Sequence, residues 1–256
     1  MILEDSYHII KRGDNMRIGV FDSGIGGINV LSCLIEKYPN NEYVFFGDTE
    51  NLPYGDKTKE ELLILASHAI DFLLSKNVDI IIIACGTISS SCYDELKEKY
   101  HVPLYDIISP TIKYLEKCNL DKIGVIGTKR TIESGIFNLA GKHIHTKATP
   151  SFVPIIENNN VEEDKDLILD KLTCFENYDL LVLGCTHYPA LKELIEEGIH
   201  TKTLDMGEVL VNDINLTNDG NYKCELYFSL VSVNLVNNIN NILDTEYQIY
   251  TKQKRV

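Results

Sequence analysis

Two stretches of this sequence decide its fold: Val78-Asp-Ile-Ile-Ile-Ile-Ala-Cys85 and, 100 positions later, Tyr178-Asp-Leu-Leu-Val-Leu-Gly-Cys185. Each has an Asp, four apolar residues, one small residue and a Cys. A run that is apolar throughout is typical of a strand buried on both faces of a parallel sheet. A second pair, Arg17-Ile-Gly-Val20 and Lys122-Ile-Gly-Val125, recurs in the same order. The repetition indicates two related α/β units, each with a Cys at the end of a buried strand.

The rest of the chain alternates between apolar runs and segments with helical spacing, which predicts parallel sheets covered by helices. The predicted strands are Ile18–Phe21, Tyr43–Phe46, Ile80–Ala84, Leu104–Ile108, Ile123–Ile126, Phe152–Ile156 and Leu180–Leu183. The predicted helices are Glu60–Ser75, Asp94–Tyr100, Glu163–Phe175 and Ala190–Glu197. We expect an α/β fold of two pseudo-symmetric, doubly wound parallel-sheet domains with the active site in the cleft between them.

The domain boundaries follow from this pattern. Residues 1–16 are expected to form an N-terminal extension, residues 17–110 the first domain, and residues 111–221 the second, ending in an Asn-rich loop. Residues 222–256 carry a further apolar stripe, which predicts a strand and a closing helix that pack back onto the first domain.

Composition excludes several classes of protein. The chain has 256 residues and a formal net charge of −14, which argues against nucleic acid or an anionic membrane surface as a partner. Its seven cysteines include no C-x-x-C pair, and its seven histidines lack metal-ligand spacing, so neither a disulfide scaffold nor a metal site is expected. Residues 1–16 do not resemble a signal peptide, and the longest apolar run, Ile80–Cys85, is too short to span a membrane. We therefore expect a reduced, cytoplasmic protein.

Cys85 and Cys185 are the candidate catalytic groups. Ligands of open α/β sheets bind beyond the carboxyl ends of the strands, where both cysteines are expected. A thiol at the start of a helix is also favoured as thiolate. Either Cys alone would be interpreted as a packing residue. As a pair they suit inversion of a stereocentre, because one thiol can remove a proton while the other delivers one to the opposite face. The other five cysteines are interpreted as packing residues.

A Gly-rich turn, Asp22-Ser-Gly-Ile-Gly-Gly27, follows the first predicted strand. It is not a dinucleotide fingerprint, because Asn29 occupies the position of the third glycine. Its free N–H groups suit a carboxylate or a phosphate. Asp22 itself could hold an ammonium group, tune a nearby thiol or cap the following helix. His187 is the one histidine beside a candidate catalytic group.

These motifs together identify a resemblance. The stretches that carry it are Ile18–Gly27, Gly47-Asp-Thr49, Pro53-Tyr-Gly55, Ala84-Cys-Gly-Thr87, Ile123–Thr128, Val153–Glu157 and Leu183-Gly-Cys-Thr-His-Tyr-Pro189. In this order they resemble the cofactor-independent glutamate racemases of the aspartate/glutamate racemase superfamily, from Met16 to the C-terminus. The resemblance implies interconversion of L- and D-glutamate, with D-glutamate supplied for peptidoglycan. It also implies that no metal or pyridoxal phosphate takes part and that the protein is a homodimer.

The resemblance also implies roles for individual residues. Cys85 and Cys185 match the two acid/base thiols, and Asp22, His187 and Glu157 match side chains that assist them. Positions that hold the substrate's carboxylates and amine are matched by Ser23, Tyr54, Gly55, Gly86, Thr87 and Thr186, with Thr128 and Thr131 in a matching neighbourhood. One departure is Gly86, where the family usually has Asn. No Arg occurs in these motifs, so N–H groups, hydroxyls and helix dipoles are expected to hold an anionic substrate.

Three alternatives stay open at this point. The first is racemisation of aspartate or another small amino acid. The second is a thiol hydrolase using Cys185 and His187, which is disfavoured because residues two apart tend to point in different directions and Cys85 would go unused. The third is a catalytically silent relative that binds a ligand or regulates another protein.

Overall fold

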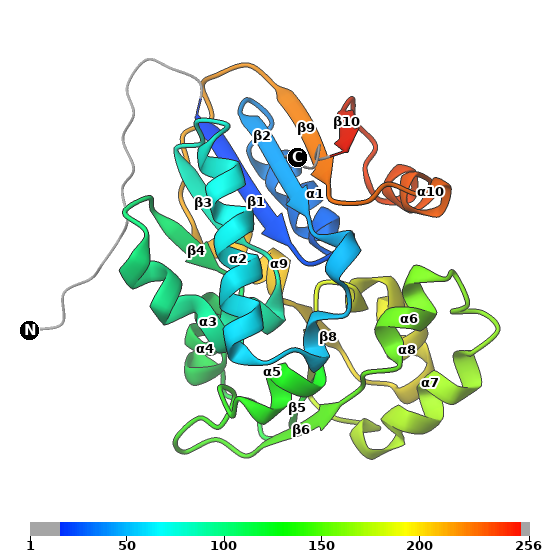
Figure 1. Ribbon diagram of the computed structural model, residues 1–256. Coiled ribbons are helices and arrows are strands. Elements are labelled where there is room, and N and C mark those ends of the chain that lie inside the picture. Colours follow the sequence, from blue (N-terminus) through cyan, green and yellow to red (C-terminus); the bar gives the residue numbers. More distant parts are fainter. Residues whose placement is uncertain (1–15, 252–256) are drawn as a thin grey trace, which may run out of the picture.

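The structure is a computed structural model, and it describes residues 16–251. Within them the strands form two parallel sheets, with the orders β10-β9-β2-β1-β3-β4 and β6-β5-β7-β8 (Figure 1). The first sheet consists of β1 (Arg17–Asp22), β2 (Glu42–Gly47), β3 (Ile80–Ile83), β4 (Leu104–Asp106), β9 (Lys223–Phe228) and β10 (Gln248–Thr251). The second consists of β5 (Ile123–Gly127), β6 (Ile144–Ala148), β7 (Leu180–Gly184) and β8 (Thr203–Asp205).

Helices connect and cover these strands. The α-helices are α1 (Gly27–Lys37), α2 (Lys59–Leu74), α3 (Gly86–Lys99), α4 (Ile108–Lys117), α5 (Lys129–Glu133), α6 (Phe152–Glu157), α7 (Lys165–Leu172), α8 (Lys192–Ile199), α9 (Met206–Asp213) and α10 (Val233–Ile242). Short 3-10 helices are η1 (Thr49–Asn51), η2 (Tyr54–Asp56), η3 (Thr173–Phe175) and η4 (Tyr188–Leu191). The α/β class with two parallel sheets is therefore confirmed.

The two sheets repeat one topology, as the sequence echo predicts. Without β9 and β10, the order β2-β1-β3-β4 of the first sheet matches β6-β5-β7-β8 of the second, place for place. The repeated sequences lie in equivalent strands, because β1 corresponds to β5 and β3 to β7. The carboxyl ends of β3 and β7 therefore occupy equivalent places in the two sheets. The division into domains near residues 110 and 221 stays a prediction.

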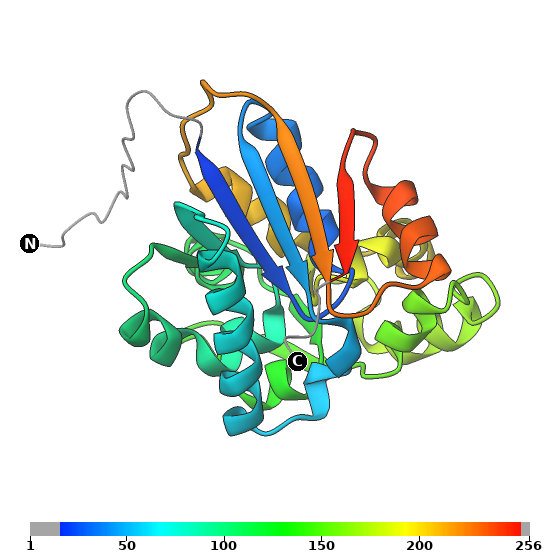
Figure 2. The same ribbon diagram turned by 45° about the horizontal axis from the view of Figure 1, so that its top comes forward.

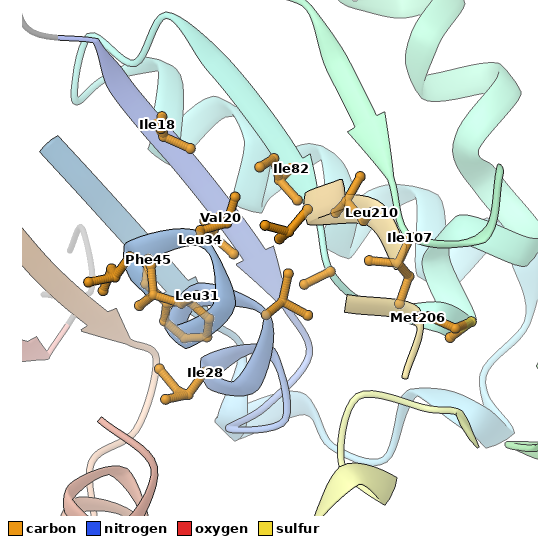
Figure 3. Packing of buried hydrophobic residues seen from close by; sticks show 14 of the residues in the cluster. Ile18, Val20, Ile28, Leu31, Leu34, Phe45, Ile82, Ile107, Met206 and Leu210 are labelled. Atoms are coloured by element: carbon orange, nitrogen blue, oxygen red, sulfur yellow. The ribbon is translucent and has the colours of Figure 1, made fainter. Parts of the chain in front are cut away.

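The first sheet is buried on both faces, which explains its apolar strands. Ile80 and Ile82 of β3 face α1 and α9, whereas Ile81 and Ile83 face α2 and α3. On the α1 side, Figure 3 shows Ile18, Val20 and Ile82 of the sheet beside Leu31 and Leu34 of α1 and Met206 and Leu210 of α9. Helix α9 follows β8 of the second sheet, so its contacts with α1 and α4 join the two halves through one continuous core.

The C-terminal segment extends the first sheet, as expected. Strand β9 pairs in parallel with β2, and α10 packs on α1 through Leu235 and Ile239 (Figure 2). A further edge strand, β10, pairs in parallel with β9 and was not predicted.

One predicted strand is wrong. Phe152–Ile156 lies in helix α6, and the strand at this point of the topology is β6, some residues earlier. Phe152, Ile155 and Ile156 are buried at helical spacing, and Pro154 would remove a donor from a strand while it suits a first helical turn. Strand β6 lies at an edge, is partly exposed and mixes polar with apolar residues, so it has no apolar run to reveal it.

The predicted helices all overlap helices of the structure. Glu60–Ser75 matches α2, whose start is fixed by a capping box between Thr58 and Glu61. Asp94–Tyr100 is only the second half of α3, which begins at Gly86. The two other predictions overlap α7 with η3 and η4 with α8.

The expected N-terminal extension lies outside the described residues except for Met16. Met16 is fully buried, and its carbonyl oxygen accepts a hydrogen bond from the Glu42 N–H at 2.9 Å, so it belongs to the first sheet's core. Residues 252–256, the end of the segment predicted to complete the first domain, also lie outside the described part. Between residues 16 and 251, no helix is long and apolar enough to cross a membrane.

Candidate active site

A cavity of about 120 Å³ lies where the carboxyl ends of the two sheets meet. It is smaller than the roughly 300–1,000 Å³ pockets that hold drug-sized ligands, so it suits a small metabolite. The residues that line it are Ser23, Leu52, Pro53, Tyr54, Gly55, Asp56, Cys85, Gly86, Thr87, Thr128, Lys129, Pro150, Val153, Pro154, Cys185, Thr186 and His187. A larger, open groove of about 1,080 Å³ between α2 and the β9–β10 edge contains neither cysteine.

Cys85 lies between β3 and α3 and is 3% exposed. Its thiol donates a hydrogen bond to Ser23 Oγ at 3.5 Å. Burial and the negative charge of Asp22 raise the pKa of Cys85 to about 12, although its hydrogen bonds with Ser23 and with the Ile88 N–H oppose this rise. Burial therefore opposes the thiolate that the start of a helix would favour at Cys85.

Cys185 lies in the turn between β7 and η4 and begins a chain of polar contacts. Its Sγ is 3.7 Å from His187 Nδ1, and His187 Nε2 is 2.9 Å from Glu157 Oε1 at the end of α6. Burial alone lowers the pKa of His187, but its hydrogen bonds with Cys185 and Glu157 outweigh burial and raise that pKa well above 6.5. A protonated ring donates from both nitrogens and places positive charge beside the sulfur.

The contact between Cys185 and His187 corrects one argument from sequence. Residues two apart lie on the same face within a strand, and in any case β7 ends at Gly184, so Cys185 and His187 lie in a turn where their side chains meet. The objection to a Cys185–His187 pair on geometric grounds is wrong. Its other ground stands, because Cys85 also lines the cavity and would go unused in a hydrolase.

Asp22 lies behind the cavity wall, fully buried at the end of β1. Its carboxylate accepts hydrogen bonds from the Gly24 N–H at 2.8 Å and from Thr186 Oγ1 at 3.1 Å. Burial raises the pKa of Asp22 above 3.8, and the charge of His187 together with these hydrogen bonds only partly offsets the rise. Asp22 therefore joins the Gly-rich turn of the first sheet to the Cys185 turn of the second.

The residues predicted to bind substrate fall into two groups. Those that line the cavity are Ser23, Tyr54, Gly55, Gly86, Thr87, Thr128 and Thr186. Thr131 does not line it; its hydroxyl lies 2.9 Å from that of Thr128, which lies 3.0 Å from that of Thr87. This chain of hydroxyls crosses from α3 of the first half to α5 of the second.

Gly86 leaves no room for the side chain that the family usually has there. A Cβ atom at position 86 would lie 2.9 Å from the carbonyl oxygen of Gly184, closer than real Cβ atoms come to backbone oxygen. The two strand ends that carry the thiols thus approach each other at this point. The N–H of Gly86 remains, at the start of α3.

Comparison with known proteins agrees with this geometry. Residues 36–214 match the family model described as Asp/Glu/Hydantoin racemase. This chain belongs to that family. It is 38% identical over 246 residues to the glutamate racemase of Aquifex aeolicus, covering 91% of this chain and 96% of that protein.

Two solved racemases share the fold along nearly the whole chain. The glutamate racemase of Aquifex pyrophilus has a TM-score of 0.78 at 34% identity and covers 92% of this chain and 98% of its own. The enzyme of Francisella tularensis, solved in complex with D-glutamate, has a TM-score of 0.82 at 30% identity, covering 94% and 97%.

The sequence-based prediction of this Asp/Glu racemase site omits several residues, among them Lys129, Asn29 and Asp48. Lys129 lines the cavity, which adds a cationic side chain to the N–H groups, hydroxyls and helix dipoles expected to hold an anionic substrate. Asn29 donates from Nδ2 to the Thr186 carbonyl oxygen at 2.8 Å, and buried Asp48 accepts a hydrogen bond from the Tyr54 hydroxyl at 2.6 Å. Lys129 directly follows Thr128, and Asp48 lies inside a motif already noted, but neither position reveals where its side chain points.

The remaining cysteines are less uniform than expected. Cys33, Cys92, Cys118 and Cys224 are partly or fully buried, as packing residues would be, whereas Cys174 is exposed, so its interpretation as a packing residue is wrong. Nowhere between residues 16 and 251 do three His, Cys, Asp or Glu side chains form a group able to hold a metal ion. A reaction without metal or cofactor stays a prediction.

Proposed function

We propose that this protein is a glutamate racemase that interconverts L- and D-glutamate by proton transfer between the substrate's α-carbon and two thiols, without a cofactor. The observation that carries the proposal is that Cys85 and Cys185, at equivalent strand ends of two like sheets, line one small cavity. Membership in the Asp/Glu/Hydantoin racemase family and the glutamate racemases among its relatives support the choice of substrate.

The surroundings of the thiols suggest their resting states. The pKa of His187 is raised well above 6.5, so a positive charge lies 3.7 Å from Cys185 Sγ. Burial and the charge of Asp22 raise the pKa of Cys85 to about 12, which keeps that thiol protonated. We assign the role of base to Cys185 and the role of acid to Cys85 for one enantiomer, because only Cys185 has a cation beside its sulfur.

The proton balance of one turnover follows from these states. The Cys185 thiolate takes the α-proton, so an S–H bond forms as the Cα–H bond breaks and the electron pair delocalises into the substrate's α-carboxylate. Cys85 then gives its own proton to the opposite face of Cα and becomes the thiolate. The other enantiomer reacts with the roles reversed, so the protonation states exchange with each inversion.

Substrate binding is assigned to the groups around the thiols. The hydroxyls of Ser23, Thr87, Thr128 and Thr186 and the side chain of Lys129 lie on the cavity wall and can hold the two carboxylates. Backbone N–H groups of Gly55 and Gly86 add preorganised donors. Asp22 and Glu157 do not line the cavity, so they act through Thr186 and His187 respectively.

The deciding experiment incubates the purified protein in D2O with each enantiomer of glutamate and of aspartate, without added cofactor. Circular dichroism follows chirality, and NMR follows uptake of deuterium at the α-carbon. We expect inversion of glutamate with deuterium in the product. No inversion with any of the four substrates would overturn the proposal, and inversion of aspartate alone would change the substrate.

Variants of the two thiols test the mechanism. Cys85→Ala and Cys185→Ala should each abolish inversion, whereas the control Cys174→Ala, which removes an exposed thiol, should not. Each single variant retains one thiol facing one side of the α-carbon. We therefore expect slow deuterium exchange without inversion, in opposite enantiomers for the two variants. Exchange of the same enantiomer by both would contradict thiols on opposite faces.

A homodimer and a place in the cytoplasm belong to the same proposal and rest on the resemblance to glutamate racemases. Sedimentation velocity at micromolar concentration tests the assembly. A single species at the 29.0 kDa of one chain would overturn the dimer. The product D-glutamate suits peptidoglycan synthesis.

A further inference from the structure

One segment of the first half reaches across the cavity to the second half. Residues 48–58 connect β2 to α2, and their middle part, Leu52–Asp56, lines the cavity. Figure 1 shows this connection running from the end of β2 towards α5. On its own side it is held by the hydrogen bond from the Tyr54 hydroxyl to Asp48.

Arg130 of α5 holds the other end of this segment. Its Nε donates to the carbonyl oxygen of Lys57 at 3.1 Å, and its Nη2 donates to the same oxygen. Beside this contact, Gly55 packs so closely on Thr128 that a Cβ atom at Gly55 would lie 3.1 Å from the Thr128 Cβ. The contact therefore joins the segment to the short helix whose first turn carries cavity residues Thr128 and Lys129.

Arg130 does not touch the cavity itself, in contrast to its neighbour Lys129. Its guanidinium is partly buried and directs two N–H groups at one backbone oxygen. A charge-assisted contact of this kind fixes position more firmly than a lysine ammonium would, because the guanidinium is planar and its donors are preorganised.

We infer that Arg130 is a positioning residue that fastens the Leu52–Lys57 segment onto α5 and so closes the cavity over bound substrate. The inference rests on the proposed function, since it assigns the closure to glutamate binding. Loss of the contact should weaken retention of both enantiomers equally, because the segment spans the two halves and favours neither thiol.

The test compares three variants. Arg130→Met removes the two donors and keeps an unbranched side chain, and Arg130→Lys keeps the charge. Lys57→Ala is the matched control, because it removes a positive charge at the same place but leaves the accepting backbone carbonyl intact. Steady-state kinetics with each enantiomer and hydrogen exchange of the amides in residues 52–58 are measured for all of them.

For Arg130→Met we expect KM to rise about tenfold for both enantiomers, with kcat within about twofold of the wild type. Arg130→Lys should lie between these values, and Lys57→Ala should match the wild type. Amides of residues 52–58 should exchange faster in Arg130→Met than in Lys57→Ala, with the rest of the chain unchanged.

Two results would overturn the inference: Arg130→Met behaving like Lys57→Ala in KM and exchange, or exchange accelerated throughout the chain, which would indicate general loosening. The hydrogen-exchange comparison needs no substrate. A wild-type protein that fails to racemise glutamate would therefore refute the proposed function separately from the role of Arg130.

Discussion

At Asp22 the requirements of folding and of the proposed chemistry oppose each other. The carboxyl group is fully buried, and burial raises its pKa above 3.8 in the folded protein. As pH rises from 3.8 to the folded pKa, the unfolded chain loses its proton first, so the free energy of unfolding falls. Above the folded pKa the free energy of unfolding no longer changes with the titration of Asp22, and the full cost of burying its charge remains. Where Asp22 is charged in the folded protein, that charge destabilises the fold, and together with burial it favours the protonated thiol of Cys85.

Asp22→Asn should accordingly separate stability from activity. We expect a higher free energy of unfolding than the wild type at pH 7.5, because the penalty for burying a charge is removed. Racemisation should fall about tenfold or more, since Cys85 loses the charge that holds its proton and Thr186 loses a charged acceptor. Urea unfolding at pH 7.5 and at pH 4 measures the first effect, and the polarimetric rate measures the second.

The pH dependence is the internal control for this substitution. The gain in stability should shrink as pH falls towards 3.8, where the unfolded wild-type chain also begins to hold the proton. A variant that is less stable than the wild type at pH 7.5 would contradict the direction of the shift.

The start of α1 shows how one element serves both halves. Asn29 lies one turn into this helix, and its Nδ2 donates to the carbonyl oxygens of Gly26 at 3.2 Å and Thr186 at 2.8 Å. Gly26 approaches the same turn so closely that a Cβ atom there would lie 2.4 Å from Thr186 Oγ1. Helix α1 thus fixes the turn that carries Cys185, although the two belong to different sheets.

Asn29→Ala should loosen that turn without removing any group that contacts substrate. We expect the free energy of unfolding to fall by about 1 kcal/mol, the worth of a partly buried hydrogen bond, and kcat/KM to fall about tenfold. Asn237→Ala, an exposed position on α10, is the control for replacing Asn by Ala in a helix. Equal kcat/KM in the two variants would show that the Asn29 contact does not position Cys185.

Helices and strands could be predicted where their burial produces a long or regular pattern of apolar residues. β3 and β7 are apolar on both faces, and the likeness of their sequences predicts the repeated topology. The prediction of a strand at Phe152–Ile156 is wrong because a short apolar run fits either structure, and only Pro154 and the spacing of the buried residues favour a helix. Edge strands β6 and β10 are exposed enough to leave no such signal.

The candidate site could be predicted to the same extent. Cys85 and Cys185 stood out because both halves place a thiol after an equivalent strand. Lys129 and Arg130 are adjacent in sequence, yet one lines the cavity and the other holds Lys57. Which of two neighbours on a short helix points inward depends on the packing of the two halves, and no local pattern records it.

At the scale of the whole molecule, a formal net charge of −14 repels an anionic substrate, so a local cation has to offset the field near the cavity. Lys129 is placed to do this, with its side chain 59% exposed and its Nζ 3.9 Å from Glu133. Lys129→Met should raise KM for both enantiomers about fivefold at low ionic strength, a change typical of one exposed charge. The difference in KM between Lys129→Met and the wild type should be smaller in 0.5 M NaCl, because the Debye length is only about 4 Å at that ionic strength.

Lys165→Met is the matched control for this charge. It changes the net charge equally, but Lys165 lies on α7, pairs with Glu162 and does not line the cavity. If both variants raised KM alike, the effect would come from total charge and not from the position of Lys129.

The two like sheets place the thiols at equivalent strand ends, but the groups behind them differ: Asp22 on one side, His187 with Glu157 on the other. L- and D-glutamate are mirror images with the same free energy in water, so their equilibrium constant is one. The two kcat/KM values must then be equal, however unlike the helpers are. The difference between the two sides can therefore appear only in the separate values of kcat and KM for each enantiomer, whose ratio is the same. Such an enzyme must convert both enantiomers at the same rate when equal concentrations lie far below KM. It can convert one enantiomer faster than the other only when substrate saturates the site.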